Sequence, residues 1–370
     1  MSRRFLPRKH LHRLHHALVQ AGYEVIGPQV KDDAIVFAPL AHVDQLPWGW
    51  QEQADAGSYR LQRTAGERAF AWNTGPQGLK PWLFLPEQPL WRAEHTDDGL
   101  RFRAVEPKPR LLAFIGLRGC DLAALRIQDQ HFIKGPYADA FYRAQREHLF
   151  IVAVNCGRSA DTCFCVSTGD GPEARFGFDI LLDELAEGYL LQTGSDKGDT
   201  ITAQLPLNKA KNKQLSEAET ALVAARRQQR VMPGEAELAQ LVDRLDHPRW
   251  QQVAERCLAC GNCTSVCPTC FCSKQDTEGD IRHRQAEQVQ RWDSCFSEQH
   301  SYITGKVIRH ELRHRYRQWL VHKLATWQQQ FGRSGCVGCG RCIAWCPVAI
   351  DLVEESQALL EEPSQEGDHG

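Results

Sequence analysis

Two cysteine runs share one spacing, and that spacing constrains the chain more than any other feature of its sequence. Each run has the form C-x2-C-x2-C-x3-C-P, and the cysteines are Cys257, Cys260, Cys263 and Cys267 in the first run and Cys336, Cys339, Cys342 and Cys346 in the second. This spacing is typical of [4Fe–4S] cluster binding. Three cysteines at short intervals wrap a tight loop around one corner of a cubane, whereas the cysteine before the proline turns away and reaches the other cluster.

The spacing therefore predicts crossed ligation of two clusters. The predicted ligands are Cys257, Cys260, Cys263 and Cys346 for cluster 1, and Cys336, Cys339, Cys342 and Cys267 for cluster 2. We expect Gly261, Gly338 and Gly340 to let the backbone approach the sulfides. The alternative is a pair of zinc sites, which usually use two separated C-x-x-C pairs, and two complete cluster runs disfavour it.

Cysteine usage also indicates the cellular setting. The chain has 370 residues, enough for two or three domains, and 15 cysteines, none of them in the first 119 residues. Disulfide frameworks belong to small secreted domains, whereas C-x-x-C runs in a long chain favour cluster or metal binding in a reducing, cytoplasmic setting. The net charge of −2 gives no indication of nucleic acid or of a membrane surface.

The N-terminus, "MSRRFLPRK", is superficially similar to a twin-arginine export signal. Such a signal requires a continuous apolar segment next, but the chain continues with "HLHRLHHALVQAGYE". The sequence therefore favours a basic amphipathic helix, on which His10, His12, His15 and His16 form a solvated face. No run of eighteen apolar residues is present, so no transmembrane helix is expected.

Residues 1–232 are predicted to form a mixed α/β domain. "LHRLHHALVQAG" has helical periodicity and ends at Gly22, and "DAIVFAPL" has the composition of a short strand. Leu111–Leu117 is predicted to be a buried strand, followed by a turn at 118–120 and a helix with Asp121 as its N-cap. "HLFIVAVNC" is a second buried strand, and "GFDILLDELAEGYLLQTGS" is predicted to be a helix followed by a strand. This order predicts a sheet covered by helices.

Seven cysteines lie outside the two runs: Cys120, Cys156, Cys163, Cys165, Cys270, Cys272 and Cys295. Cys120 and Cys156 follow predicted strands directly, where ligands of α/β sheets tend to bind, and "TCFC" occurs at 162–165 and again at 269–272. The candidate ligands of a third cluster are Cys120, Cys156, Cys163 and Cys165. The alternatives are a zinc ion held by the same thiolates or buried free cysteines that pack as small apolar side chains. For Cys270, Cys272 and Cys295, packing near the first cluster is favoured over ligation.

Residues 233–355 are predicted to form an α-helical ferredoxin-like domain with the two [4Fe–4S] clusters, after a polar helical segment that is broken at Pro233–Gly234. About seventy residues separate the two runs; this insert has helical periodicity, and its second half, 307–331, is predicted to be an amphipathic helix. Its many arginines and histidines form either a solvated face or a docking face for a partner subunit. The acidic segment 356–370 is expected to be a frayed tail.

Some chemistry is not supported by any motif. The chain lacks a G-x-x-x-x-G-K-[ST] phosphate loop and a convincing strand–GxGxxG–helix unit, so binding of NAD or FAD by this chain is not expected. The sequence thus predicts electron carriers without a catalytic site of their own.

Several segments resemble one protein family. The segments are "CLACGNCTSVCPTCFC", "RWDSC" at 291–295, "HKL" at 322–324, "FGRSGCVGCGRCIAWCPVAID" at 331–351, and, earlier, "GLRGCDLAAL" and "NC" followed by "TCFC". They are similar to the beta subunits of cytoplasmic NiFe sulfhydrogenases and equally to the iron–sulfur subunits of anaerobic sulfite reductases. The resemblance covers 111–352. Family members often have proline where Gly119 stands, and a more glycine-rich stretch than "STGDGP", which bears on loop geometry and not on the thiolates.

The resemblance implies a non-catalytic iron–sulfur subunit that relays electrons in a cytoplasmic multi-subunit oxidoreductase. A flavin/NAD(P)-binding subunit would donate electrons, and the small and large subunits of a NiFe hydrogenase would accept them. The first alternative is an anaerobic sulfite reductase, in which the sirohaem subunit would be the acceptor. A second alternative is a redox sensor or scaffold whose clusters do not turn over, and a third is an enzymatic role for the N-terminal α/β domain. Neither nucleic acid nor a membrane is an expected partner.

Overall fold

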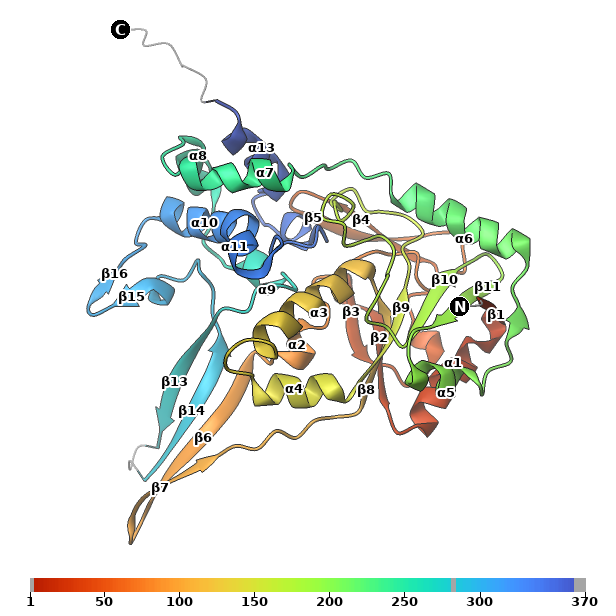
Figure 1. The fold of residues 1–370 in the computed structure, drawn as a ribbon, viewed down its shortest axis with the longest axis horizontal. Helices are drawn as coiled ribbons and strands as arrows, with labels where there is room; N and C mark the ends of the chain where they lie inside the picture. The colour runs from red at the N-terminus through yellow and green to blue at the C-terminus, as the bar shows by residue number, and fades with distance from the viewer. Residues whose placement is uncertain (1–2, 281–283, 363–370) are drawn as a thin grey trace.

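The computed structural model describes residues 3–280 and 284–362. An eight-stranded mixed sheet forms the body, a four-stranded antiparallel sheet projects from it, and a layer of short helices lies across one end (Figure 1). The strand order of the large sheet is β12-β1-β11-β10-β9-β8-β2-β3. Its strands are β1 (Arg4–Pro7), β2 (Glu24–Lys31), β3 (Ala34–Pro39), β8 (Leu112–Leu117), β9 (Leu149–Val154), β10 (Ile180–Glu184), β11 (Gly188–Thr193) and β12 (Asn208–Lys209).

The centre of this sheet is made by the strands with the most continuous apolar sequence. Every residue of β8 and of β9 is buried, and β2, β8, β9 and β10 pair in parallel. Such continuous apolar runs are expected where both faces of a parallel sheet are covered. Side chains alternate along β9, so Phe150 and Val152 enter the core on one face and Leu149 and Ile151 enter the core on the other.

Helices cover both faces. On the first face, α1 (Leu11–Gln20) and α5 (Asp196–Thr202) pack on the sheet through residues such as Leu14 and Ile201. On the second face lie α2 (Lys80–Leu83), α3 (Gly119–Phe132) and α4 (Ala140–Glu147), with Leu122 and Tyr142 in the core. The structure confirms the predicted helix that ends near Gly22. It also confirms the predicted strands of this region and the sheet covered by helices.

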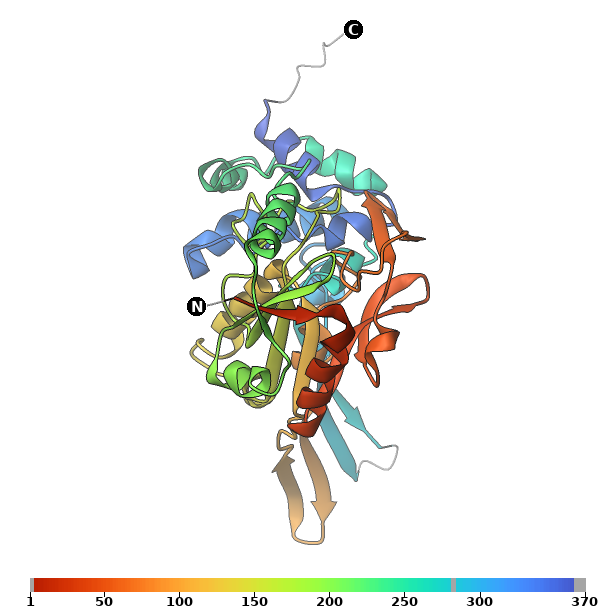
Figure 2. The same ribbon diagram turned by 90° about the vertical axis from the view of Figure 1, so that its right-hand side faces the viewer.

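The projecting sheet joins distant parts of the chain. Its order is β13-β14-β6-β7, and its strands are β6 (Glu87–Thr96), β7 (Gly99–Ala104), β13 (Ser273–Gly279) and β14 (Gln285–Trp292). Figure 2 shows both hairpins extending away from the body. The predicted helical character of the insert is therefore wrong in its first half. Pairing with β6, in which Arg92 and Glu287 are 195 residues apart, overrides the local periodicity.

The helical layer carries both cysteine runs and has its own aromatic core around Trp250, Phe296, Tyr316 and Trp319. Its helices are α7 (Glu235–Ala239), α8 (Arg249–Arg256), α9 (Asn262–Ser265), α10 (Leu312–Val321), the π-helix η5 (His322–Thr326), α11 (Trp327–Phe331), α12 (Arg341–Ala344) and α13 (Leu352–Leu360). The helix α6 (Asn212–Ala225) lies instead against the large sheet, where Ala218 packs with Phe5 and Leu190 (Figure 1). The smaller elements of the chain are β4 (Trp50–Asp55), β5 (Ser58–Arg63), β15 (Tyr302–Ile303), β16 (Lys306–Val307), and the 3-10 turns η1 (Arg8–His10), η2 (Val43–Gln45), η3 (Gln240–Asp243) and η4 (Gln299–Ser301). In the described part of the chain, every helix is too short or too polar to cross a bilayer.

Two local predictions on the large sheet are wrong. The predicted helix before "GYLLQTGS" is strand β10, which forms an antiparallel hairpin with β11, because a short apolar run fits a buried strand and a buried helix equally well. Asp121 is not the N-cap of α3. That position is Arg118, and the Asp121 carboxylate accepts a hydrogen bond from the Arg118 backbone N–H at 3.0 Å.

Two predictions near the C-terminus also need correction. The helix predicted over 307–331 begins at Leu312 and is interrupted by the π-helix η5. The predicted tail is helical up to Leu360, because Leu359 packs into the aromatic core and Asp351 caps α13. Residues 363–370 of the predicted tail lie outside the described residues. The domain boundary at 232 stays a prediction, and the pairing of β6 with β14 connects its two sides.

Candidate iron–sulfur sites

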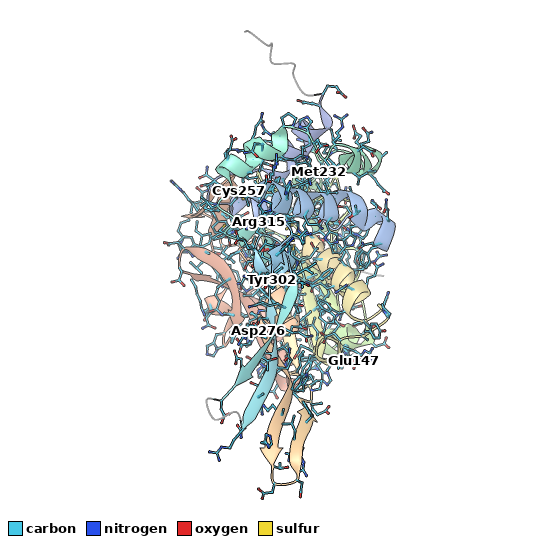
Figure 3. All side chains as sticks on the ribbon, turned by 90° about the vertical axis from the view of Figure 1, so that its left-hand side faces the viewer. Glu147, Met232, Cys257, Asp276, Tyr302 and Arg315 are labelled. Carbon is cyan, nitrogen blue, oxygen red and sulfur yellow. The ribbon has the colours of Figure 1, made fainter. Side chains whose placement is uncertain are left out.

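The four cysteines predicted to hold cluster 1 line one cavity in the helical layer. Cys257, Cys260, Cys263 and Cys346 all contribute to its wall, together with Cys342 and the aromatic side chains Phe296, Tyr316 and Trp319. In Figure 3, Cys257 lies in this layer, and Tyr302 and Asp276 follow in turn toward the tip of the projecting sheet. The structure thus brings a cysteine of the second run to three cysteines of the first.

Both runs fold in the same way locally. Gly261 and Gly340 have φ angles of +71° and +73°, and each is followed at once by a single helical turn, α9 or α12. A positive φ is accessible to glycine without a steric penalty, so the chain can reverse before the third cysteine of each run. The two short helices contact each other, which places the runs side by side.

Donor groups in these loops point at sulfur. The backbone N–H of Ala259 lies 3.5 Å from Cys257 Sγ, that of Gly338 lies 3.4 Å from Cys336 Sγ, and that of Ile350 lies 3.3 Å from Cys346 Sγ. The buried Tyr316 hydroxyl, at the first cavity, has no hydrogen-bond partner among the described residues. Sulfur-rich anions are suitable acceptors for such groups, so the site fits an iron–sulfur cluster.

A buried lysine lies beside Cys267, one of the cysteines predicted for cluster 2. The Lys323 ammonium lies 3.4 Å from Cys267 Sγ and donates hydrogen bonds to Thr269 Oγ1 at 3.0 Å and to the Gly335 carbonyl at 3.4 Å. No carboxylate forms an ion pair with Lys323 within the described ranges. Burial opposes its charge, but the thiolates of Cys267 and Cys270 dominate, and its pKa is raised well above the usual value. An uncompensated buried cation is costly, so the site is built for anionic sulfur.

Of the remaining cluster 2 cysteines, Cys336 and Cys339 are buried and Cys342 is partly buried. Burial is the main cause that raises the pKa of Cys336 to about 12, with Lys323 opposing it and Cys339 and Cys267 adding to it. Burial also raises the pKa of Cys342, followed by its neighbours Cys336, Cys267 and Cys339. Because these cysteines influence the pKa of one another, Cys336, Cys339, Cys342 and Cys267 lie near one another, as the predicted cluster 2 requires.

The candidate third site lies where the large sheet meets the second run. Cys120 is in the first turn of α3 and Cys156 follows β9, whereas Cys163 and Cys165 lie in the following loop, and all are buried. Cys120 and Cys165 belong to the same apolar cluster as Cys339 of the second run. The Asp121–Arg341 ion pair, with 2.7 Å between Oδ1 and Nη2, joins α3 to α12 at the same place.

The first "TCFC" loop and the second run touch through their backbones. The Phe164 N–H donates to the Gly338 carbonyl at 2.9 Å, and a Cβ atom on Gly338 would lie 2.5 Å from the Cys165 Cα. A Cβ on Gly340 would lie 2.4 Å from the Thr162 carbonyl oxygen. These glycines therefore allow close approach to a protein loop, in addition to the approach to sulfide that the sequence predicts.

Substituting Gly338 by alanine is expected to destabilise the chain by roughly 2–4 kcal/mol, since the added methyl group adds a backbone clash to the strain of a positive φ. Gly332 is the matched control, because it also has a positive φ, +67°, and nothing lies within 4 Å of its Cβ position. Thermal unfolding of the two variants under anaerobic conditions measures the difference. Equal melting temperatures for Gly338→Ala and Gly332→Ala would contradict the close packing.

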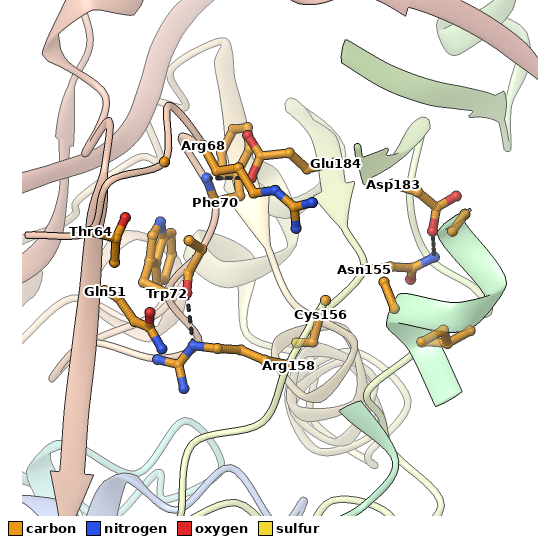
Figure 4. A pocket seen from close by; sticks show the side chains of 16 residues that line it. Gln51, Thr64, Arg68, Phe70, Trp72, Asn155, Cys156, Arg158, Asp183 and Glu184 are labelled. Atoms are coloured by element: carbon orange, nitrogen blue, oxygen red, sulfur yellow. Dashed lines mark hydrogen bonds between the residues drawn. The ribbon is translucent and has the colours of Figure 1, made fainter. Parts of the chain in front are cut away.

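A cavity of about 290 Å³ opens beside the third site. Figure 4 shows Cys156 at its wall between Arg158 and Asn155. Opposite them, the Glu184 carboxylate accepts hydrogen bonds from the backbone N–H groups of Ala69 and Phe70 at 2.7 Å and 2.8 Å. Because Cys156 reaches this cavity, the third site lies close to a solvent-accessible space.

Two buried lysines near the cysteines could not be identified from the sequence. Lys323 stands in the segment "HKL" without any sign of its role, and Lys80 carries no sequence signal at all. Lys80 lies on α2, donates to the Thr264 carbonyl at 3.0 Å and sits 4.1 Å from the ring centre of Trp292. Burial lowers its pKa, and the nearby thiols of Cys270 and Cys267 act in the opposite direction. The remaining cysteines, Cys270, Cys272 and Cys295, line another cavity with His300 and Lys323.

Comparisons with known proteins agree with this geometry. Residues 256–350 match the family model of a 4Fe-4S dicluster domain, which supports [4Fe–4S] binding by this region. The chain is 32% identical over 263 residues to the sulfhydrogenase 2 subunit beta of Pyrococcus furiosus, in an alignment that covers 66% of this chain and 73% of that protein. No solved structure matches the chain. By this similarity, together with the match over both cysteine runs, the chain belongs to the sulfhydrogenase beta-subunit family.

Proposed function

We propose that this chain is the iron–sulfur electron-transfer subunit of a multi-subunit NiFe sulfhydrogenase in the cytoplasm. It receives electrons from a flavin/NAD(P)-binding partner and delivers them to the small and large hydrogenase subunits. The observation that carries the proposal is the single cavity lined by Cys257, Cys260, Cys263 and Cys346, since the ligands of one cluster come from both runs. That interleaving is the arrangement of two-cluster ferredoxins.

In this proposal, each cysteine run contributes ligands to both clusters. The first three cysteines of each run hold one cluster, and the cysteine before each proline, Cys267 or Cys346, holds the other. When bound, the clusters supply one-electron carriers. The chain's own groups set their environment: backbone N–H groups point at Cys257, Cys336 and Cys346, and Lys323 offsets negative charge near Cys267.

The sites of cluster 1, cluster 2 and the candidate third cluster are contiguous in space. Cys342 of the second run also lines the cavity of cluster 1, and Cys339 packs with Cys120 and Cys165 of the third site. This contiguity supports a conducting path from the helical layer to the end of the large sheet. We extend the proposal to a third cluster held by Cys120, Cys156, Cys163 and Cys165.

Replacing Cys163 by alanine is expected to remove about four irons per chain if the third site holds a cubane. Iron, zinc and acid-labile sulfide are measured on anaerobically purified protein, with Thr168→Ala in the same loop as the control. Unchanged iron would leave these thiols as packing residues, and the loss of zinc alone would identify a zinc site. Either of those results rejects the third cluster.

Partner capture tests the function as a whole. The tagged full chain is purified anaerobically from its native host, and the co-purifying proteins are identified by mass spectrometry. A NiFe catalytic subunit together with a flavoprotein is the expected result. A sirohaem subunit would assign the chain to sulfite reduction, and a chain recovered alone at every salt concentration would favour the redox sensor or scaffold.

A further inference from the structure

The β13–β14 hairpin brings three cysteines outside the cluster runs to one place. Cys270 and Cys272 precede β13, and Cys295 follows β14. At the open end of the hairpin, Ser273 pairs with Trp292. Just beyond this pair, the Asp293 N–H donates to the Cys272 carbonyl at 2.9 Å. Residues more than twenty positions apart are thereby fixed on one cavity, which Cys270, Cys272 and Cys295 all line.

A histidine with a carboxylate partner lines the same cavity. His300 lies in the turn η4, and its Nδ1 is 2.5 Å from Asp293 Oδ2. This pair resembles the carboxylate–histidine pairs that orient imidazole ligands toward metals, where the carboxylate fixes the tautomer and leaves Nε2 free to bind. His300 lines the cavity together with Cys272 and Cys295, so the imidazole and the thiols share one space.

The cavity has a volume of about 130 Å³, and its wall contains donors without acceptors. Among the described residues, Arg309 Nε and Trp327 Nε1 are buried and have no hydrogen-bond partner. Trp319, whose Nε1 is a third such donor, lines both this cavity and that of cluster 1. Buried N–H groups rarely remain unpaired, so an acceptor-rich group is missing from the protein atoms.

Positive charge surrounds the same position. Lys323 lines the cavity and Lys80 lies near the thiols of Cys270 and Cys272, and both lysines are buried without a carboxylate in the described part of the chain. Lys323 also contacts Cys267, so it alone would indicate only cluster 2. Lys80 adds a second buried cation near Cys270 and Cys272, so positive charge is available to offset anionic sulfur at this cavity as well.

We propose that Cys270, Cys272, Cys295 and His300 hold a further [4Fe–4S] cluster, separate from the two clusters of the dicluster domain and from the candidate third site. A single zinc ion would draw its ligands within about 2.3 Å of one point and leave no cavity between them. No group of three His, Cys, Asp or Glu side chains in 3–280 and 284–362 is arranged to hold one ion. The cavity of about 130 Å³ that these residues line leaves room for a larger inorganic group.

The repeated "TCFC" segment supports the same assignment. In the first copy, Cys163 and Cys165 join two cysteines from other segments, and in the second copy Cys270 and Cys272 join Cys295 and His300. Each copy thus contributes two thiols, separated by one residue, to a different group of candidate ligands. The π-helix η5 carries Lys323 at the second copy, and such helical irregularities are frequent at functional sites.

The test uses the full chain, purified anaerobically within its native complex. The double variant Cys272→Ala/Cys295→Ala is expected to lose about four irons and about four sulfides per chain. Pulsed EPR of the reduced wild type is expected to show coupling to a histidine nitrogen, and His300→Cys is expected to keep the iron and lose that coupling. His322→Ala is the control, since His322 lines the same cavity and should change neither quantity.

Several results would overturn the proposal. They are unchanged iron in the double variant, loss of one zinc instead of iron, or a wild-type spectrum without histidine coupling. The wild-type spectrum remains decisive if the cysteine variants fail to fold. The proposal rests on the iron–sulfur character of the proposed function. Its failure is still distinguishable from failure of that function, because iron that depends on Cys257 and Cys336 would persist.

Discussion

Replacing Cys346 by alanine is expected to remove about four irons per chain, and adding Cys257→Ala to that variant is expected to remove no more. Both thiols line the cavity of cluster 1 although they belong to different runs. Once one ligand loss has removed a cluster, a second substitution at the same cluster has nothing further to release. Iron and acid-labile sulfide per folded chain are the quantities to measure.

The matched control pairs the same cysteine with a residue of its own run. Cys346→Ala combined with Cys336→Ala is expected to remove about eight irons, because the two cysteines serve different clusters. If each run held its own cluster, the two double variants would exchange their results. That exchange would reject crossed ligation while leaving the number of clusters unchanged.

Replacing Lys323 by methionine is expected to lower the reduction potential of cluster 2 by roughly 100 mV, the size of a unit charge at close range in a partly screened interior. Reduction adds negative charge next to Cys267, and the ammonium 3.4 Å from that sulfur stabilises the reduced state. Methionine keeps an unbranched chain in the buried site and removes only the charge. An EPR-monitored redox titration of the full chain gives the shift.

Lys306→Met provides the control for this prediction. Lys306 is exposed on β16, so solvent screens its charge, and its substitution should leave every potential within experimental error. A potential unchanged in Lys323→Met would mean that the lysine does not face a cluster. A shift toward more positive values would contradict the electrostatic role assigned to it.

The parts of this molecule that depend on local spacing could be predicted from the sequence. The cysteine intervals specify a loop geometry over about a dozen residues, and the structure brings Cys346 to the first run as that geometry requires. The apolar strands before Cys120 and Cys156 are also local features, since β8 and β9 are buried along their whole length. For this reason the placement of both cysteines at strand ends was predictable.

Features made by distant residues were not predictable in the same way. The strand β14 pairs with β6, and no local signal in "RQAEQVQRW" specifies a partner so far away in the chain. His300 and Asp293 become a pair only after this hairpin has formed, and Lys80 reaches Cys270 from another part of the fold. A single sequence identifies the thiols through their motif, but the charges that surround them are assembled by tertiary structure.

Freeze-quench EPR of the native complex tests the relay most directly. The complex is mixed with hydrogen or with NAD(P)H and frozen at successive times, and the signal that moves in Lys323→Met marks a cluster of this chain. We expect this signal to appear at least as fast as one turnover of the complex. A cluster that stays oxidised while the complex turns over would show that electrons bypass this chain and would contradict its role as a conductor.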